Sequence, residues 1–158
     1  MSETDNLSLL WEIGPKFVDG SPHCVEMGIE FVSVNIGRAT MRLPYSKKLT
    51  GNPRNRVIHG GAVTALLDHS MGLAATSRFN PLCMVATLNL SIDYMRAPRP
   101  GDTILASAEC YKTTRSIAFV RAIAHTGDID DPVALGQATF VTIGTLPREQ
   151  ASSSGENS

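Results

Sequence analysis

The sequence is poor in cysteine and has no long apolar run. Its three cysteines, Cys24, Cys83 and Cys110, are odd in number and widely spaced, and no two of them form a CxxC pair. This argues against a disulfide framework and against a cysteine-bound zinc site, and it predicts a reducing compartment. No apolar stretch reaches the length that a helix needs to cross a bilayer. We therefore expect no membrane span.

Net charge and targeting signals are also scarce. The 14 Lys and Arg residues stand against 15 Asp and Glu residues, without a basic stripe or an acidic tract. A nucleic-acid-binding surface and a solvating acidic tail are therefore both disfavoured. The first residues, Met1–Asp5, are polar and acidic, whereas a signal peptide is basic and then apolar. These observations predict a soluble cytoplasmic protein that binds neither nucleic acid nor a membrane.

Apolar residues are plentiful enough for one packed domain. The chain has 158 residues, of which 42% are hydrophobic, and this length can close a real core. We expect an N-terminal extension with a short helix (1–22), one folded domain (23–147) and a C-terminal tail (148–158). The tail has no large hydrophobic residue that could dock, so we expect it to be disordered.

The spacing of apolar residues predicts two helices and six strands. The first helix is limited by Gly14-Pro15 and could be capped by Asp5 or Asn6. A hairpin follows, with its turn at Asn35–Gly37. The predicted helices cover 7–17 and 60–77, and the predicted strands cover 27–34, 38–43, 84–95, 103–112, 117–126 and 133–143.

The order of these elements predicts an α+β fold built around the second helix. Short turns between strands imply antiparallel pairing. The helix over 60–77 is apolar on nearly every side, and such a helix is normally buried. A curved antiparallel sheet wrapped around one long central helix meets both conditions. The outer side of the helix must still be covered, and a second subunit is the obvious cover.

One acid interrupts the central helix. Gly60 and Gly61 open the helix, and Asp68 lies in its middle. An acid in a buried helix needs a partner, a raised pKa or a chemical role. At about 100° per residue, Gly61 and Asp68 fall within about 20° of the same face, which Thr64 and Gly72 share broadly. The sequence thus predicts a narrow lane of small and polar side chains on an otherwise apolar helix.

Three features together resemble a known family. They are the His59-Gly60-Gly61 opening, the acid Asp68 eight residues after Gly60, and the strand-and-turn segment Asp93–Asp102. With the sheet-around-helix order, they are similar to the hotdog-fold acyl-CoA thioesterases over residues 26–143, and most of all to the phenylacetate-pathway (PaaI-type) branch. The resemblance implies hydrolysis of a thioester to a free acid and coenzyme A. It also implies a homodimer or a homotetramer (a dimer of dimers) with active sites at subunit interfaces.

The resemblance implies further residue roles and no added cofactor. Relatives need neither a metal nor a bound redox group, and coenzyme A is part of their substrate. Many relatives have an Asn six residues before the His of the triplet, where this chain has Pro53, so Asn52 or Asn55 would have to serve. A Ser or Thr on the strand after the helix often assists the water in relatives, and alignment on Tyr94 makes Thr87 the candidate here.

The helix opening suits the chemistry of thioester cleavage. The first amides of a helix have no internal partner and lie in the positive end of the helix dipole. Glycine lets a carbonyl oxygen approach them, so the N–H of Gly60 or Gly61 could stabilise the developing oxyanion, which is worth on the order of 3 kcal/mol in known cases. Asp68 would act either as the nucleophile, giving a mixed anhydride, or as a general base for water. We favour the base, with Thr87 helping to place the water and the lane of Thr64 and Gly72 holding the acyl group.

The histidines and several other residues each admit a functional and a plain interpretation. His59 could be a catalytic base, but a role in holding the loop is the expected one. His69 should pack at the interface or meet solvent, and His23 and His125 receive no role. Arg96 and Arg99 could bind coenzyme A phosphates or be ordinary surface charges, as could Lys47 and Lys48. Met71 could line the acyl pocket, as could Met84 and Met95, or simply fill the core.

Two other functions stay open at this point. A hydratase or dehydratase of the same superfamily would use a His paired with an acid, which the glycine opening between His59 and Asp68 suits less well. A non-catalytic acyl-CoA-binding module is the third possibility, although no helix-turn-helix or basic arm accompanies the domain. Aryl, medium-chain and long-chain acyl groups all fit this composition.

Overall fold

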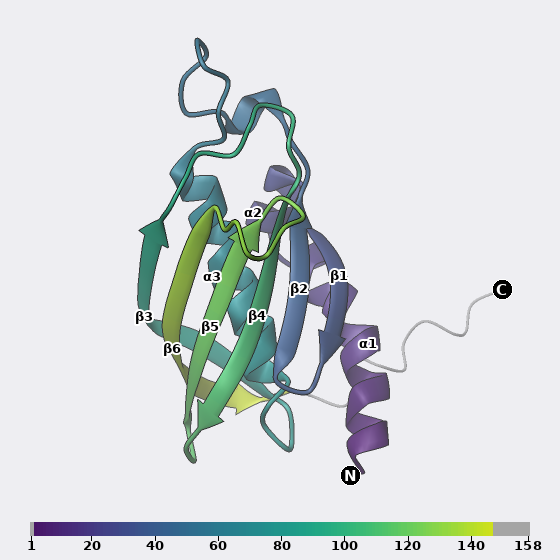
Figure 1. The fold of residues 1–158 in the computed structure, drawn as a ribbon. Helices are drawn as coiled ribbons and strands as arrows, with labels where there is room; N and C mark the ends of the chain where they lie inside the picture. The colour runs from purple at the N-terminus through teal and green to yellow at the C-terminus, as the bar shows by residue number, and fades with distance from the viewer. Residues whose placement is uncertain (1, 147–158) are drawn as a thin grey trace, which may run out of the picture.

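The computed structural model describes residues 2–146, which form one curved sheet around a long helix (Figure 1). The sheet has six strands in the order β1-β2-β4-β5-β6-β3, and each neighbouring pair is antiparallel. The predicted fold class is therefore confirmed, and the predicted tail at 148–158 lies outside the described residues. The elements are α1 (Glu3–Asp19), α2 (Pro22–Met27), β1 (Glu30–Asn35), β2 (Arg38–Leu43), a 3-10 helix (Lys47–Leu49), α3 (Gly60–Thr76), β3 (Cys83–Tyr94), β4 (Ile104–Thr113), β5 (Ile117–His125) and β6 (Ala134–Thr145).

Small side chains on the inner face of the sheet let it wrap closely around α3. Alternate residues of β4, β5 and β6 point inward, as the period of a strand requires, and many of these buried residues are alanines. They face the large buried side chains of α3, so the helix side chains fill most of the core and the small strand side chains let the sheet approach the helix closely. The alanines are Ala106, Ala108, Ala118, Ala122, Ala124, Ala134 and Ala138, and the fully buried helix residues include Leu66, Leu67, Met71 and Leu73.

The N-terminal helix is longer than predicted. It begins after Ser2, whose side chain accepts a hydrogen bond from the backbone of Asp5 in a capping box, so the predicted caps at positions 5 and 6 are wrong. It continues through Pro15, because Gly14 serves packing rather than helix termination. A Cβ on Gly14 would lie 2.4 Å from the ring of Phe31, so glycine is what allows α1 to lie directly on β1.

The structure adds a short helix, α2, that the apolar spacing did not predict. The side chain of Ser21 caps this helix, and Pro22 occupies its first turn, where the missing N–H costs nothing. The helix ends at Gly28, whose φ of 76° is the left-handed conformation typical of a glycine cap. Strand β1 therefore begins at Glu30 and not at position 27.

The central helix has the predicted extent but is not buried on every side. It begins at Gly60 after the cap residue His59 and ends at Thr76. Residues such as Thr64 and Asp68 are only partly buried, whereas the side facing the sheet is fully enclosed. One side of α3 therefore remains open near its N-terminal half, where the predicted catalytic residues lie.

Part of the outer side of α3 is covered by this chain's own N-terminal helix. The Nε2 atom of His69 lies 2.8 Å from the carbonyl oxygen of Phe17, and the two rings are 4.7 Å apart between centroids. A Cβ on Gly72 would lie 3.6 Å from the same Phe17 ring. The structure gives His69 a partner within its own chain, in α1, and leaves the residue partly exposed, so its contact with a second subunit stays a prediction. Within the described residues, no helix is both long and apolar enough to cross a bilayer.

Candidate active site

The start of α3 leaves one backbone donor free. The N–H of Gly61 donates to Nδ1 of His59 at 2.8 Å, so this imidazole is unprotonated at Nδ1 and carries its proton on Nε2 when neutral. The N–H of Gly60 has no partner among residues 2–146. Of the two predicted oxyanion donors, the structure thus keeps Gly60 available and engages Gly61. The same contact shows His59 capping the helix, which is the structural role favoured for it.

The carbonyl of Gly60 is held by two hydroxyl groups. The hydroxyl of Tyr94 at the end of β3 donates to this carbonyl oxygen at 2.9 Å, and the Oγ1 of Thr64 donates to it at 3.1 Å. The Tyr94 and Thr64 hydroxyl oxygens also lie in contact with each other, and because each hydroxyl has one proton, only two of these three hydrogen bonds can form at once. Sequence reasoning assigned Tyr94 no role, since a contact between residues 34 positions apart has no local signal. Thr64, predicted to contact substrate, uses its hydroxyl on the helix itself.

The predicted acid and hydroxyl come together. Thr87 of β3 donates its hydroxyl to Oδ1 of Asp68 at 2.8 Å. The carboxyl is partly buried, so it is neither free in bulk water nor sealed in the core. No described arginine or lysine forms an ion pair with it. The hydroxyl therefore fixes one carboxylate oxygen and leaves the other able to take a proton from a water molecule.

Gly60 and Asp68 are too far apart in one chain to act on the same carbonyl directly. Eight residues separate them, which is about 12 Å along a helix that rises about 1.5 Å per residue. The free N–H of Gly60 also points out of the helix start and away from Asp68. An oxyanion donor lies about 3 Å from the oxygen that it stabilises, and a nucleophile lies at about 3–3.5 Å from the carbon that it attacks. One carboxyl and one amide of the same helix do not meet these distances together.

Two hollows flank the helix start. The first, of about 380 Å³, is bounded by α2, the 3-10 helix and the residues around the His59 cap. The second, of about 360 Å³, lies on the other side against β3 and is mostly apolar. Its lining residues are Val57, Ile58, Gly60, Val63, Tyr94, Met95, Arg96, Ala97, Pro98 and Val133. The Gly60 amide thus lies where a bound molecule could reach it.

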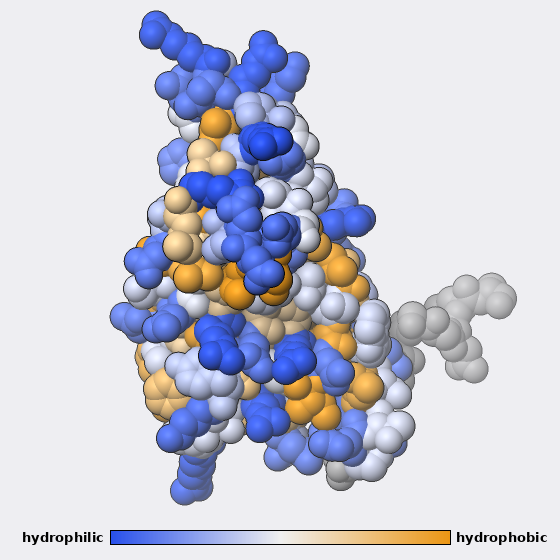
Figure 2. Space-filling model, in the orientation of Figure 1, coloured by the Kyte–Doolittle hydropathy of each residue, from blue (hydrophilic) through white to orange (hydrophobic). Residues whose placement is uncertain are grey.

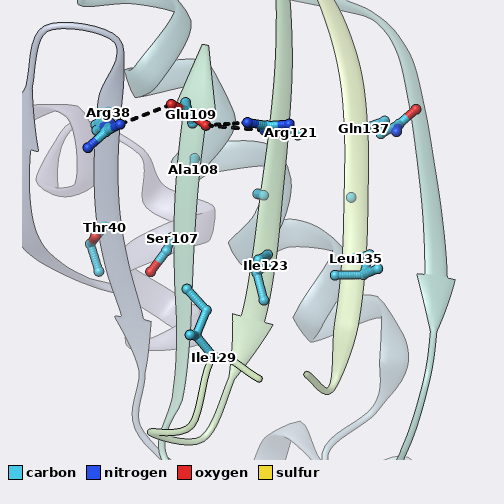
Figure 3. Close-up of a pocket in the computed structure, with 12 residues that line it drawn as sticks. Arg38, Thr40, Ser107, Ala108, Glu109, Arg121, Ile123, Ile129, Leu135 and Gln137 are labelled. Atoms are coloured by element: carbon cyan, nitrogen blue, oxygen red, sulfur yellow. Dashed lines mark hydrogen bonds and ion pairs between the residues drawn. The ribbon is translucent and has the colours of Figure 1, made fainter. Parts of the chain in front are cut away.

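A larger hollow, of about 530 Å³, lies on the outer face of the sheet and away from these residues (Figure 3). Glu109 of β4 forms ion pairs there with Arg38 of β2 at 3.1 Å and with Arg121 of β5 at 2.9 Å. The two arginines lower the pKa of Glu109 by donating hydrogen bonds to its carboxylate. Hydrophobic residues lie between the charged ones on this face (Figure 2). It contains none of the predicted catalytic residues.

The two arginines predicted to bind phosphate have different surroundings. The guanidinium of Arg96 lies 3.0 Å from the Asp131 carboxylate and donates to Thr126 at 3.0 Å, which ties the end of β3 to the loop after β5. Arg99 is exposed and shares a polar hollow of about 290 Å³ with Arg96, Asp102 and Asp131. Arg99 is therefore the freer of the two cations.

Several other predicted site residues are buried or hydrogen-bonded within their own loop. Met71 is fully buried in the core and Gly72 is buried beneath α1, which does not support substrate contact by either. The side chain of Asn52 accepts from the backbone of Arg54, and that of Asn55 accepts from Val57, so both shape their own loop. Among the described residues, no three His, Cys, Asp or Glu side chains are grouped closely enough to hold a metal ion.

Comparisons with known proteins agree on one family. The profile of the thioesterase superfamily matches residues 55–133. A candidate esterase of Halobacterium salinarum is 33% identical over 72% of this chain and 80% of its own length. The medium/long-chain acyl-CoA thioesterase YigI of Salmonella typhimurium is 22% identical over 73% of this chain and 83% of its own. The solved structure of the E. coli PaaI protein from the phenylacetic acid degradation operon has a TM-score of 0.78 and 20% identity, covering 92% of this chain and all of that one, which shows likeness of fold.

Proposed function

Since the chain belongs to the thioesterase superfamily and has the hotdog fold, we propose that it is an acyl-CoA thioesterase that hydrolyses an acyl- or aryl-CoA thioester to the free acid and coenzyme A. The observation that carries this proposal is the pairing of a free Gly60 amide at a helix start with a partly buried Asp68 held by Thr87. The first group suits a developing oxyanion, and the second suits activation of water. Coenzyme A is part of the substrate, and the proposal includes no metal or further cofactor.

Each residue has one task in the proposed reaction. The Gly60 N–H donates to the thioester oxygen as negative charge develops on it. Asp68 takes a proton from a water molecule, whose oxygen bonds to the carbonyl carbon, and the carbon–sulfur bond then breaks with release of the coenzyme A thiolate. Thr87 orients the carboxylate through its hydrogen bond. His59 holds the helix start and keeps its Nε2 proton, so it is not the base in this arrangement.

The distance between Gly60 and Asp68 leads us to propose a site shared by two copies of the chain. Strand β3 is an edge of the sheet and exposes large hydrophobic residues, with Met84 at 44% and Leu88 at 59% exposure. An unpaired apolar edge of this kind favours antiparallel pairing with a second copy. Because β3 lies along α3, such pairing would bring two antiparallel copies of α3 together. Gly60 of one copy would then face Asp68 of the other.

A homotetramer would need a second surface, for which we propose the outer face of the sheet. The row of Arg38, Glu109 and Arg121 alternates in sign across three neighbouring strands (Figure 3). Two antiparallel copies of this row can place arginine against glutamate, with Ile123, Ile129 and Leu135 filling the space between them. We also propose a cytoplasmic location, which suits three cysteines that are all free.

The purified protein tests the function when it is given a panel of aryl-, medium-chain and long-chain acyl-CoAs with a thiol-trapping reagent. Release of thiol in proportion to enzyme supports hydrolysis and identifies the acyl group. Loss of enoyl absorbance from an enoyl-CoA without free thiol would assign a hydratase instead. Binding of every acyl-CoA without any thiol release would assign a binding module.

Mixed dimers test whether the site is shared. Gly60→Pro removes the amide donor and Asp68→Asn removes the base, so each homodimer should be inactive. In a co-expressed mixture about half of the dimers are mixed, and each has one site with both groups intact, which predicts about a quarter of wild-type activity for a two-fold dimer. Sites built within one chain would give no recovery, since every site would carry a lesion.

A further inference from the structure

The peptide unit between Gly60 and Gly61 is held at both of its polar ends. Its carbonyl oxygen accepts from Tyr94 at 2.9 Å and from Thr64 at 3.1 Å. Its N–H donates to Nδ1 of His59 at 2.8 Å. These three side chains come from β3, from the second turn of α3 and from the cap position, so they approach the peptide from separate directions. Most first-turn peptides of a helix lack such side-chain contacts on both ends.

These three contacts of the Gly60–Gly61 peptide, from His59, Thr64 and Tyr94, are called the clamp below. The clamp restrains a segment that would otherwise be flexible. Two consecutive glycines have the greatest backbone freedom of any residue pair, and a helix start has the fewest hydrogen bonds to oppose it. The N–H of Gly60 is separated from the clamped peptide plane only by the backbone torsions of Gly60. Fixing the carbonyl of that residue therefore leaves only these two torsions, φ and ψ of Gly60, to set the direction in which its N–H points.

Tyr94 is the long-range member of the clamp. The other two contacts span two and four residues, whereas Tyr94 joins the helix start to the end of β3 from 34 residues away. Its ring also lies against Gly60, since a Cβ on that glycine would be 3.4 Å from the ring atom Cε1. Tyr94 is 53% exposed, yet its hydroxyl has two hydrogen-bond partners. The exposed ring therefore does not act as a core residue, and its hydroxyl is directed at the helix start.

We infer that Tyr94 is a positioning residue that orients the Gly60 amide toward the thioester oxygen. This inference rests on the proposed function, in which that amide is the oxyanion donor. An amide held in place before the substrate arrives needs no reorganisation as charge develops, which is the source of its catalytic value. Tyr94 would thus affect the transition state and not the affinity for the ground state.

The matched variants Tyr94→Phe and Tyr111→Phe test this inference. Each removes one hydroxyl from a half-exposed tyrosine, but Tyr111 lies on β4, where its ring contacts Arg121 and not the helix start. We expect Tyr94→Phe to lower kcat about tenfold, which is comparable with the loss of one hydrogen bond. KM should stay within about twofold of wild type, because an interaction made only in the transition state affects kcat and not KM. Tyr111→Phe should change neither constant.

A measurement that needs no turnover accompanies the kinetics. In protein labelled with ¹⁵N-glycine, amide hydrogen exchange at Gly61, whose N–H donates to His59, should be faster in Tyr94→Phe than in wild type and unchanged in Tyr111→Phe. Unchanged exchange would show that the hydroxyl does not hold the peptide. Faster exchange with a normal kcat, or a raised KM with a normal kcat, would also overturn the positioning role. Failure of the proposed function is seen separately, as an absence of thiol release by wild type, and exchange still decides whether Tyr94 orients the amide.

Discussion

Replacing Gly60 by proline would remove the proposed oxyanion donor and little else. Gly60 is the first residue of α3, a position where proline is well tolerated because its missing N–H has no helical partner. The preceding residue must be extended before a proline, and His59 already has φ −62° and ψ 137°. The substitution therefore deletes one N–H without asking the backbone to move.

The substitution should change kcat and stability by very different amounts. Loss of one oxyanion donor should lower kcat by about 10²–10³, or roughly 3–4 kcal/mol of transition-state stabilisation. Stability should be unchanged or rise by up to about 1 kcal/mol, because proline restricts the unfolded chain at a position whose native conformation suits it. Any contact of the new side chain with Tyr94 works against this gain, since a Cβ at this position lies 3.4 Å from the Tyr94 ring.

Gly60→Ala is the matched control, because it places a Cβ against the same ring but keeps the N–H. Steady-state thiol release and thermal unfolding would be measured for both variants. We expect Gly60→Pro to be at least about 100-fold slower than Gly60→Ala with a similar melting temperature. Equal activity of the two variants would refute the reasoning, since the amide would then play no part in turnover.

Two further predictions concern Asp68 and His69. Asp68→Asn should lower kcat by about 10²–10⁴ with a small change in KM, while Asp93→Asn, an exposed carboxyl on β3, should be normal in the same thiol assay. An Asp68→Asn protein with ordinary turnover would remove this residue from the mechanism. Burial lowers the pKa of His69, so the unfolded state, with its histidine pKa of about 6.5, binds a proton before the folded state does. The stability that neutral His69 contributes should therefore be fully present above about pH 6.5 and be lost as the pH falls below that value. Denaturant titrations at pH 7.5 and 5.5 should show a smaller decrease in the free energy of unfolding for His69→Gln than for wild type. An equal decrease in both proteins would assign the effect to another group, for example His125, whose pKa is also lowered by burial.

The elements that sequence predicted well are those with strong local periodicity. The central helix and the strands from β2 onward have nearly their predicted bounds, because apolar spacing and turn residues act over a few positions. The resemblance also pointed to Thr87 and Asp68, which the structure joins by a hydrogen bond, while their roles stay predictions. Ser2 and Asp5 form a capping-box pattern that local reasoning could have used to place the start of α1 correctly.

The features that sequence did not predict depend on contacts between distant segments. Gly14 looked like a helix terminator, but its role is set by Phe31 on a different element. His69 bonds the backbone of Phe17, and a backbone carbonyl leaves no trace in the side-chain pattern. Tyr94 reaches Gly60 only because the sheet brings the end of β3 to the helix start. Such contacts follow from the fold and are not visible before it is known.

The attachment of α1 to the central helix has a practical consequence for shortened forms of the protein. A chain beginning at Gly20 would leave His69 without its carbonyl acceptor and would uncover Gly72 and the ring of Phe31. It would also lose Leu10 and Val18, which are almost wholly enclosed. Helix α1 is thus an integral part of the domain, and its removal would expose the outer side of α3, the helix that contains Gly60 and Asp68.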